Sequence, residues 1–471
     1  MSGAPARGRG ARTAPPSRPD PVTSTPVLPA PDEGPGPVGR ELVIDVGPVA
    51  HGGHCVARSQ GRVLFVRHAL PGERVRVRVT EGGDGDRFWR ADAVEVLQAS
   101  PDRVEEPCPW AKPGLCGGCD WQHATPPAQR ALKAAVVREQ MARLAGLDVP
   151  VEVEVVDGPG VDAAAGLSWR TRVQYAVGQG GRAGLRAHRS SRVVAIDWCR
   201  IAHPRVREVA VPTAARWPGA SGVEVVAAAA GEDRLVLLEP ADRARRVRVP
   251  SLPAQASVGV HGAEGLQRVR GRTWTAEDVD LPGGRRTFRV TGSGFWQVHP
   301  GAARALVAAA LEAAAPAPGE RALDLYAGAG LFAAALAQAV GAGGRVAAVE
   351  SDQRAVADAR RNLRDLEQVR ILPGRVDRVL AGSALAQELG GPGADVVVLD
   401  PPRTGAKREV VARVAALAPR AVAYVACDPA ALARDTATFA EHGYVLDGLR
   451  AFDLFPQTHH VECVARLVPA G

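Results

Sequence analysis

Aromatic residues are scarce in this chain, and several kinds of segment are missing altogether. Only 4% of the 471 residues are Phe, Trp or Tyr, although 46% are hydrophobic, which is ample for packed cores. No apolar run reaches the roughly 20 residues that a membrane-spanning helix needs. The first arginines are not followed by an apolar core, which argues against a secretory signal peptide.

The chain has only seven cysteines, an odd number with uneven spacing, which argues against a disulfide framework. Cys108, Cys116 and Cys119 form the pattern C-x7-C-x2-C, and Cys199 is a distant fourth candidate. The C-x2-C pair is typical of metal or cluster ligands. The set predicts a 4Fe–4S cluster, with a four-cysteine zinc site as the alternative. A reducing, cytoplasmic setting follows as the default.

Positive charge is in excess, with a formal net charge of +7. This suits a polyanionic partner such as RNA, although a solvated basic surface would give the same balance. Residues 1–40 hold 10 of the 38 prolines and few apolar residues, which predicts a disordered tail. Nothing implies an obligate protein partner or a membrane, so a monomer is expected.

Residues 41–100 contain four short runs of alternating hydrophobicity separated by turns with glycine and proline. The pattern predicts a small all-β barrel of the oligonucleotide-binding type. One run places Arg74, Arg76 and Arg78 on one face and valines on the other, and such basic barrels commonly bind nucleic acid through backbone charge. A structural barrel with a solvated charged face is the alternative. The segment resembles the TRAM domain, which is fused to RNA-modifying enzymes.

The rest of the chain divides into two predicted domains. Residues 101–290 read as short strands and turns, which predicts a β-rich central domain that includes the cysteine cluster. Within it, residues 126–147 have the spacing of an amphipathic helix, which could pack on the next domain. Residues 291–471 alternate strands and helices and end in an antiparallel strand pair. That order predicts an α/β fold with a mostly parallel sheet and helices on both faces.

A glycine-rich turn follows a strand at LDLYAGAG, where Gly328 and its neighbours let a ligand approach the backbone closely. The next strand ends in Glu350, an acid placed to accept both ribose hydroxyls of a nucleoside. The turn lacks the G-x-G-x-x-G spacing that a pyrophosphate requires. A nucleoside without phosphates fits better, and this points to S-adenosylmethionine.

Three later positions suggest the reaction. Asp400-Pro401-Pro402 resembles a motif of enzymes that methylate amino groups, but an aromatic residue follows there, whereas Arg403 follows here. Cys427 ends a buried strand, at the edge where open α/β sheets place their ligands. Glu462 is an acid inside an otherwise apolar strand. A plain buried thiol and an edge-strand carboxylate facing water are the alternatives for these two residues.

Methylation of uracil at C5 needs this pair of groups. The C5 carbon is a poor nucleophile until a thiolate adds at C6 and turns C5 into an enolate carbon, which can attack a sulfonium methyl group. A base must then remove the C5 proton so that the thiol can leave. The mechanism therefore requires a cysteine and a carboxylate across one ring.

Five motifs, GFWQVHPGA, LDLYAGAGLF, VVLDPPRTG, YVACDPAALARD and HHVECVARL, resemble the RNA uracil-C5 methyltransferase family, which makes 5-methyluridine in transfer and ribosomal RNA. The resemblance implies a Rossmann-like class I methyltransferase domain in which Cys427 is the nucleophile and Glu462 the base. It implies contacts with S-adenosylmethionine at Gln297, Tyr326, Glu350 and Asp400. The family usually has cysteine at Ala327, asparagine at His299 and Asp428, and an acid at Arg375.

The barrel and the cysteine cluster extend the similarity to residues 41–470 and match the branch that modifies large-subunit ribosomal RNA. Two other enzyme reactions stay open: methylation of uridine C5 in transfer RNA and methylation of cytosine C5. A non-catalytic RNA-binding or ribosome-assembly protein is the alternative from another class.

Overall fold

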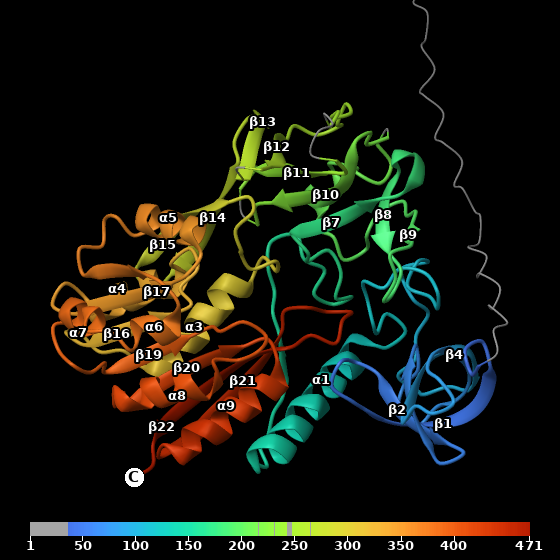
Figure 1. Cartoon of the computed structure of the whole chain (residues 1–471), viewed down its shortest axis with the longest axis horizontal. Coiled ribbons are helices and arrows are strands. Elements are labelled where there is room, and N and C mark those ends of the chain that lie inside the picture. Colours follow the sequence, from blue (N-terminus) through green and yellow to red (C-terminus); the bar gives the residue numbers. More distant parts are fainter. Residues whose placement is uncertain (1–35, 215, 230, 243–246, 264) are drawn as a thin grey trace, which may run out of the picture.

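The computed structural model describes residues 36–214, 216–229, 231–242, 247–263 and 265–471. Figure 1 shows a blue N-terminal barrel, a mostly green central sheet and an orange-to-red α/β region. The tail predicted for residues 1–40 falls outside the described residues up to residue 35. Across the described ranges, no helix combines the length and apolar character needed to cross a membrane.

The N-terminal barrel closes in the strand order β1-β2-β3-β5-β4. Its strands are β1 (Glu41–Val49), β2 (Cys55–Ser59), β3 (Arg62–Arg67), β4 (Arg74–Glu81) and β5 (Phe88–Gln98). The four predicted runs correspond to β1, β3, β4 and β5. The sequence missed β2, because its five residues are too few for a clear alternation. The barrel is closed only because β2 links β1 to β3.

The alternation in β4 directs valines inward and arginines outward, as predicted. Val75 and Val77 are fully buried in the barrel core, and Val79 is buried as well. The arginines pair with acids of neighbouring strands: Arg74 with Asp45, Arg76 with Glu95 and Arg78 with Glu41. This face is therefore balanced in charge, and it is not a bare basic surface.

Helix α1 (Pro126–Gln140) starts at Thr125, whose hydroxyl accepts a hydrogen bond from the Ala128 N–H. It continues into a π-helical turn, Met141–Ala145, and stops at Gly146, whose φ of 69° suits a glycine. The predicted helix over residues 126–147 is thus a helix with an altered last turn. It packs against α9 (Pro429–Glu441) and against β6 (Val153–Val155), the edge strand of the C-terminal sheet.

The central region is built on a seven-stranded sheet of order β13-β12-β11-β10-β7-β8-β9. Its strands are β7 (Arg172–Val177), β8 (Ala183–Arg186), β9 (Val193–Val194), β10 (Ala220–Ala227), β11 (Arg234–Pro240), β12 (Ser257–Gly262) and β13 (Gly265–Arg270), with a one-turn helix α2 (Pro204–Arg207). A separate hairpin, β14 (Trp274–Leu281) and β15 (Gly284–Thr291), packs on α5 (Gln353–Asn362) of the C-terminal region.

The C-terminal sheet has eight strands in the order β18-β17-β16-β19-β20-β22-β21-β6. Its other strands are β16 (Arg321–Leu325), β17 (Arg345–Glu350), β18 (Val369–Pro373), β19 (Val396–Leu399), β20 (Ala421–Ala426), β21 (Tyr444–Asp453) and β22 (Glu462–Pro469). Neighbouring strands run parallel except where β22 lies antiparallel between β20 and β21. The predicted mostly parallel sheet with a closing antiparallel pair is confirmed.

Helices cover both faces of this sheet. The remaining helices are α3 (Ala302–Ala314), α4 (Leu331–Val340), α6 (Val376–Val379), α7 (Ala384–Leu389) and α8 (Lys407–Ala416). One core holds α3, α4 and α5, and the other holds α1, α7, α8 and α9. Burial on both faces explains why the strands are continuous apolar runs of Val, Ala and Leu, with no alternation.

Candidate active site

The topology of the C-terminal sheet gathers the predicted reactive residues at one edge. Tyr326, Asp400 and Cys427 each follow the last residue of a parallel strand, and Glu350 is itself a last residue. Parallel strands end at the same edge of a sheet, where open α/β sheets bind their ligands. Because β22 runs the other way, it begins at that edge, and its first residue is Glu462.

Strand register places Cys427 and Glu462 side by side. Ala426 of β20 and Cys463 of β22 are the last pair of the register, and Cys427 and Glu462 are the residues next to that pair along the chain, close enough for the Glu462 carboxyl group to raise the pKa of the Cys427 thiol. A thiol and a carboxyl group therefore lie close together at the ligand edge.

The Cys427 thiol is half-buried among acids. Burial, together with the nearby carboxyl groups of Glu462 and Asp400, raises the pKa of Cys427 to about 12, although the Arg403 guanidinium lowers it. A thiol with so high a pKa is protonated at neutral pH. The free protein therefore keeps this thiol in its less reactive protonated form, and Arg403 is the cation that favours the thiolate.

The two acids beside this thiol are also perturbed. Burial raises the pKa of Glu462 well above its usual range, Asp400 raises it further, and Arg403 lowers it. Burial also raises the pKa of Asp400 to about 7. Two buried carboxyl groups so close together resist ionising at once. Perturbed acids grouped with a thiol at a ligand edge are characteristic of catalytic sites.

A cleft of about 130 Å³ opens at the thiol, and we call it the thiol cleft. Its lining comes from distant parts of the chain: His51, Gly52, Gly53, Val136, Arg403, Cys427, Asp428, Pro429, His459, His460 and Val461. His51 lies on the barrel and Val136 on α1, so three regions share this cleft. Sequence reasoning missed His51, His459 and His460, because nothing in their local patterns shows what they face.

A second cleft of about 310 Å³ lies along the same edge, and we call it the Glu350 cleft. Tyr326, Glu350, Arg375 and Asp377 are among its lining residues. The Glu350 carboxylate is held by the backbone N–H groups of Gly328 at 2.9 Å, Ser351 at 2.6 Å and Asp352 at 2.7 Å. This volume is in the range of small-ligand pockets.

Gln297 lines neither of these clefts. It lies in the segment between β15 and α3, which the start of β7 holds in place. Arg172 donates to the carbonyl groups of Gly292 and Gly294, and Thr171 donates to the Val298 carbonyl oxygen from both its N–H and its hydroxyl, at 2.9 Å each.

Three residues that differ from the usual family pattern make specific contacts in this structure. His299 is buried and stacked on Trp169, and burial lowers its pKa to about 4. Arg375 pairs with Asp377 at 2.9 Å. Asp428 accepts a hydrogen bond from the Ala431 N–H at 2.8 Å, which caps α9.

All four candidate cysteines line one cavity between the central region and the loop that precedes α1. Cys116 accepts a hydrogen bond from the Gly118 N–H at 3.4 Å, and Cys119 accepts one from the Gln122 amide at 3.1 Å. N–H groups aimed at sulfur are typical of thiolate ligands of a cluster. In the described part of the chain, no three His, Cys, Asp or Glu side chains are grouped to hold a metal ion.

Two family models match this chain. One, described as tRNA (Uracil-5-)-methyltransferase, matches residues 260–468. The other, described as the TRAM domain, matches residues 37–88, which include most of the barrel. Both resemblances predicted from the motifs are thereby confirmed.

Curated relatives match nearly the whole chain. An uncharacterized RNA methyltransferase of Streptomyces avermitilis is 52% identical over 445 residues, covering 92% of this chain and 99% of that protein. The 23S rRNA (uracil(1939)-C(5))-methyltransferase RlmD of Alkalilimnicola ehrlichii is 35% identical over 434 residues, covering 88% of this chain and 94% of that protein.

Among solved structures, the tRNA (uracil-54, C5)-methyltransferase of Pyrococcus abyssi, in complex with S-adenosyl-L-homocysteine, superposes with a TM-score of 0.63. The match covers 90% of this chain and 99% of that chain at 23% identity, which shows a shared fold. Taken with the family model and the full-length relatives, it means that this chain is an RNA methyltransferase and belongs to the uracil-C5 RNA methyltransferase family.

Proposed function

We propose that the protein methylates C5 of a uridine in large-subunit ribosomal RNA, with S-adenosylmethionine as the methyl donor. The observation that carries this proposal is the register of β20 and β22, which sets Cys427 opposite Glu462 at the edge that also holds the Glu350 cleft. A thiol, a carboxyl group and a nucleoside-sized cleft are the three parts that the chemistry needs.

In the proposed reaction, Cys427 gives its thiol proton to solvent as substrate binds, and the sulfur adds to C6 of the uracil. The electron pair of the C5–C6 double bond moves to form an enolate, and C5 then attacks the sulfonium methyl group, which leaves S-adenosylhomocysteine. Glu462, as carboxylate, removes the C5 proton. The double bond re-forms, the C6–S bond breaks, and the thiolate leaves.

Residues of the Glu350 cleft would hold the methyl donor. The Glu350 carboxylate would accept the ribose hydroxyls, Tyr326 would lie against the nucleoside, and the Gly328 turn would let the ligand approach the backbone. Gln297 and Asp400 complete the proposed contacts with the donor. The acids of this cleft suit a ligand that carries a sulfonium charge.

Ribosomal RNA is the favoured substrate because the relative from A. ehrlichii, which is named for 23S rRNA, aligns along nearly the full chain. The reduced cysteines are consistent with a cytoplasmic site of action. Transfer RNA is the second candidate. It is favoured by the fold shared with the P. abyssi enzyme, which is named for tRNA.

Mapping 5-methyluridine in RNA from cells with and without this protein tests the proposal. We expect one or more 23S uridines to lose the methyl group when the protein is removed. Loss from transfer RNA alone would move the substrate to the second candidate. Loss of 5-methylcytidine, or growth rescue by a Cys427→Ala protein, would contradict uridine methylation as the function.

We also propose that Cys108, Cys116, Cys119 and Cys199 hold a 4Fe–4S cluster. Support comes from their convergence on one cavity and from the N–H donors aimed at two of the sulfurs. Bound there, the cluster would cross-link the central region to the loop before α1. Anaerobic purification followed by iron, sulfide and zinc analysis tests this, and a colourless protein with stoichiometric zinc would contradict it.

A further inference from the structure

The turn between β1 and β2, residues 50–54, leaves the barrel and contacts the C-terminal region. We call it the barrel turn. The His51 Nε2 atom lies 3.0 Å from Oδ2 of Asp428, the residue that follows Cys427. This contact spans 377 positions of sequence, and it joins the barrel directly to the reactive edge.

Gly53 in the same turn is fitted closely to the loop that leads to Glu462. A Cβ atom at Gly53 would lie 2.5 Å from Cβ of His459, a distance that real side chains do not reach. Its φ of 81° also favours glycine. The Gly53 carbonyl oxygen accepts a hydrogen bond from the Trp121 indole at 3.0 Å. The turn is therefore anchored on two sides.

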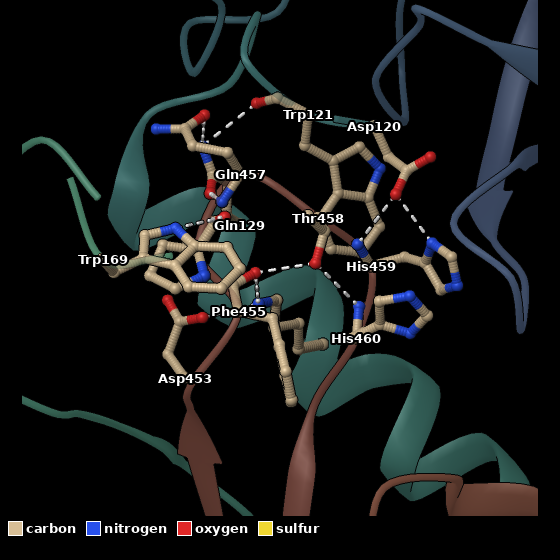
Figure 2. Close-up of polar contacts among 12 residues, drawn as sticks. Asp120, Trp121, Gln129, Trp169, Asp453, Phe455, Gln457, Thr458, His459 and His460 are labelled. Carbon is tan, nitrogen blue, oxygen red and sulfur yellow. Dashed lines mark hydrogen bonds and ion pairs between the residues drawn. The ribbon is translucent and has the colours of Figure 1, made fainter. Parts of the chain in front are cut away.

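The loop on the other side of this contact, residues 454–461, is held just as firmly, as Figure 2 shows. Asp120 accepts hydrogen bonds from the His459 N–H at 3.1 Å and binds its ring at 2.7 Å. The Gln457 carbonyl oxygen accepts the N–H groups of Asp120 and Trp121. This loop ends at Glu462, so one junction fixes the approach to both reactive residues.

The barrel turn is part of the thiol cleft and contacts the residue next to the thiol. His51, Gly52 and Gly53 line that cleft together with Cys427. The partner of His51, Asp428, is also the N-cap of α9, so the backbone that carries the thiol is fixed by a helix on one side and by the barrel on the other.

We propose that the barrel turn is a wall of the target-base pocket and that His51 is a positioning residue for Cys427, acting through Asp428. On this view the barrel takes part in the covalent step as well as in holding RNA. The proposal rests on the proposed function, which supplies the identity of the target base. The family usually has asparagine at position 428, and here the carboxylate is matched by a histidine of the barrel.

Single-turnover kinetics with saturating RNA and S-adenosylmethionine test the proposal, using His51→Ala, Asp428→Asn and the double variant. Misplacing a reacting group by about 1 Å can lower a rate up to about 100-fold. We expect His51→Ala to slow methyl transfer about 10- to 100-fold, with RNA and donor dissociation constants unchanged within about twofold. The double variant should be no slower than the worse single variant, because both changes break one pair.

Matched controls separate a local effect from a general one. Arg285→Ala removes an exposed arginine of β15 that pairs with Asp280 and lines neither cleft, and it should leave the rate unchanged. His51→Gln keeps a hydrogen-bonding group and should recover part of the rate, which also guards against a misfolded alanine variant. A His51→Ala rate within about twofold of wild type, or losses that multiply in the double variant, would overturn the proposal.

A second measurement does not depend on methylation. Cys427 is alkylated in the free protein with a small and with a bulky maleimide, and the ratio of the two rates is compared. Both reagents attack the thiolate, so a change in the thiol pKa cancels in the ratio. If the barrel turn shields the thiol, the relative rate of the bulky reagent should rise in His51→Ala but not in Arg285→Ala. An unchanged ratio would contradict the proposal that the barrel turn is a wall of the pocket. A wild-type protein that does not methylate RNA would count only against the proposed function.

Discussion

The two clefts at the edge of the C-terminal sheet are built in opposite ways. The Glu350 cleft takes its residues from positions 326–410, that is, from consecutive strand–helix units of one sheet. The thiol cleft takes residues from the barrel turn, from α1 and from three loops of the sheet. One cleft needs a single folding unit, whereas the other is complete only when the barrel and α1 are docked on that unit.

Charge separates the two clefts as well. Glu350, Asp377 and Glu409 line the first, beside Arg375 and Lys407. Arg403 and three histidines line the second, with Asp428 as its one acid. Acids suit a sulfonium donor, and the Arg403 guanidinium suits the phosphates around a target base. The comparison predicts that donor binding and base chemistry can be damaged independently.

The largest effect is expected from Cys427→Ala. Without the thiolate there is no route to the C5 nucleophile, so methylation should fall to background and no protein–RNA adduct should form. S-adenosylmethionine affinity should be unchanged, since Cys427 does not line the Glu350 cleft. Filter binding with labelled S-adenosylmethionine measures the donor affinity, and a gel assay detects the protein–RNA adduct. Residual 5-methyluridine formation would show that another residue is the nucleophile.

Glu462→Gln should be the next most damaging change. The amide keeps the shape of the side chain but cannot take the C5 proton, so methylated adduct should accumulate and its release should slow by about 10²- to 10⁴-fold. Mass spectrometry of the covalent complex over time follows this. Rapid release at the wild-type rate would remove Glu462 from the role of base.

Lys133→Ala should disrupt the thiol cleft by lowering the stability of the folded protein. Lys133 is buried on α1, and its ammonium group lies 2.5 Å from the Asp453 carboxylate and 3.0 Å from the Phe455 carbonyl oxygen. Leaving Asp453 buried without its partner should cost about 3–5 kcal/mol of unfolding free energy. Thermal melting checks this, with the exposed Lys112→Ala as the control. Equal melting temperatures would show that the pair contributes nothing.

Glu350→Gln should damage only the donor cleft. It removes the carboxylate charge that would accept the ribose hydroxyls, so donor affinity should weaken by about 1.5–3 kcal/mol. Alkylation of Cys427 should not change. Glu409→Gln, on the rim of the same cleft, is the matched control for calorimetry with S-adenosylmethionine. Equal weakening in both variants would indicate a nonspecific charge effect.

The smallest effect concerns Arg403→Gln. Since the pKa of Cys427 is raised to about 12, the thiolate fraction in the free protein should grow about tenfold per pH unit from pH 7 to 10. Arg403 lowers this pKa, so its removal should raise the pKa and slow alkylation at every pH in that range. Peptide mapping after timed iodoacetamide treatment measures it. Faster alkylation would reverse the assigned role of Arg403.

Much of the fold could be predicted from the sequence. Alternation identified four of the five barrel strands, and apolar runs identified the parallel sheet, because both patterns are local. The short strand β2 and the altered last turn of α1 were not visible, since pairing partners and packing decide them. The motifs around Gly328 and Cys427 predicted a ligand-binding edge of the sheet, because a strand followed by a glycine- or proline-containing turn is a local pattern.

By itself, the sequence determined the family and the chemical groups at the edge of the sheet, since these are properties of short motifs. Only the tertiary structure decided that Cys427 faces Glu462 and that His51 of the barrel contacts Asp428. The physical reason is that such contacts depend on strand register and on the docking of surfaces hundreds of residues apart. No local pattern of hydrophobicity or charge encodes where those surfaces meet.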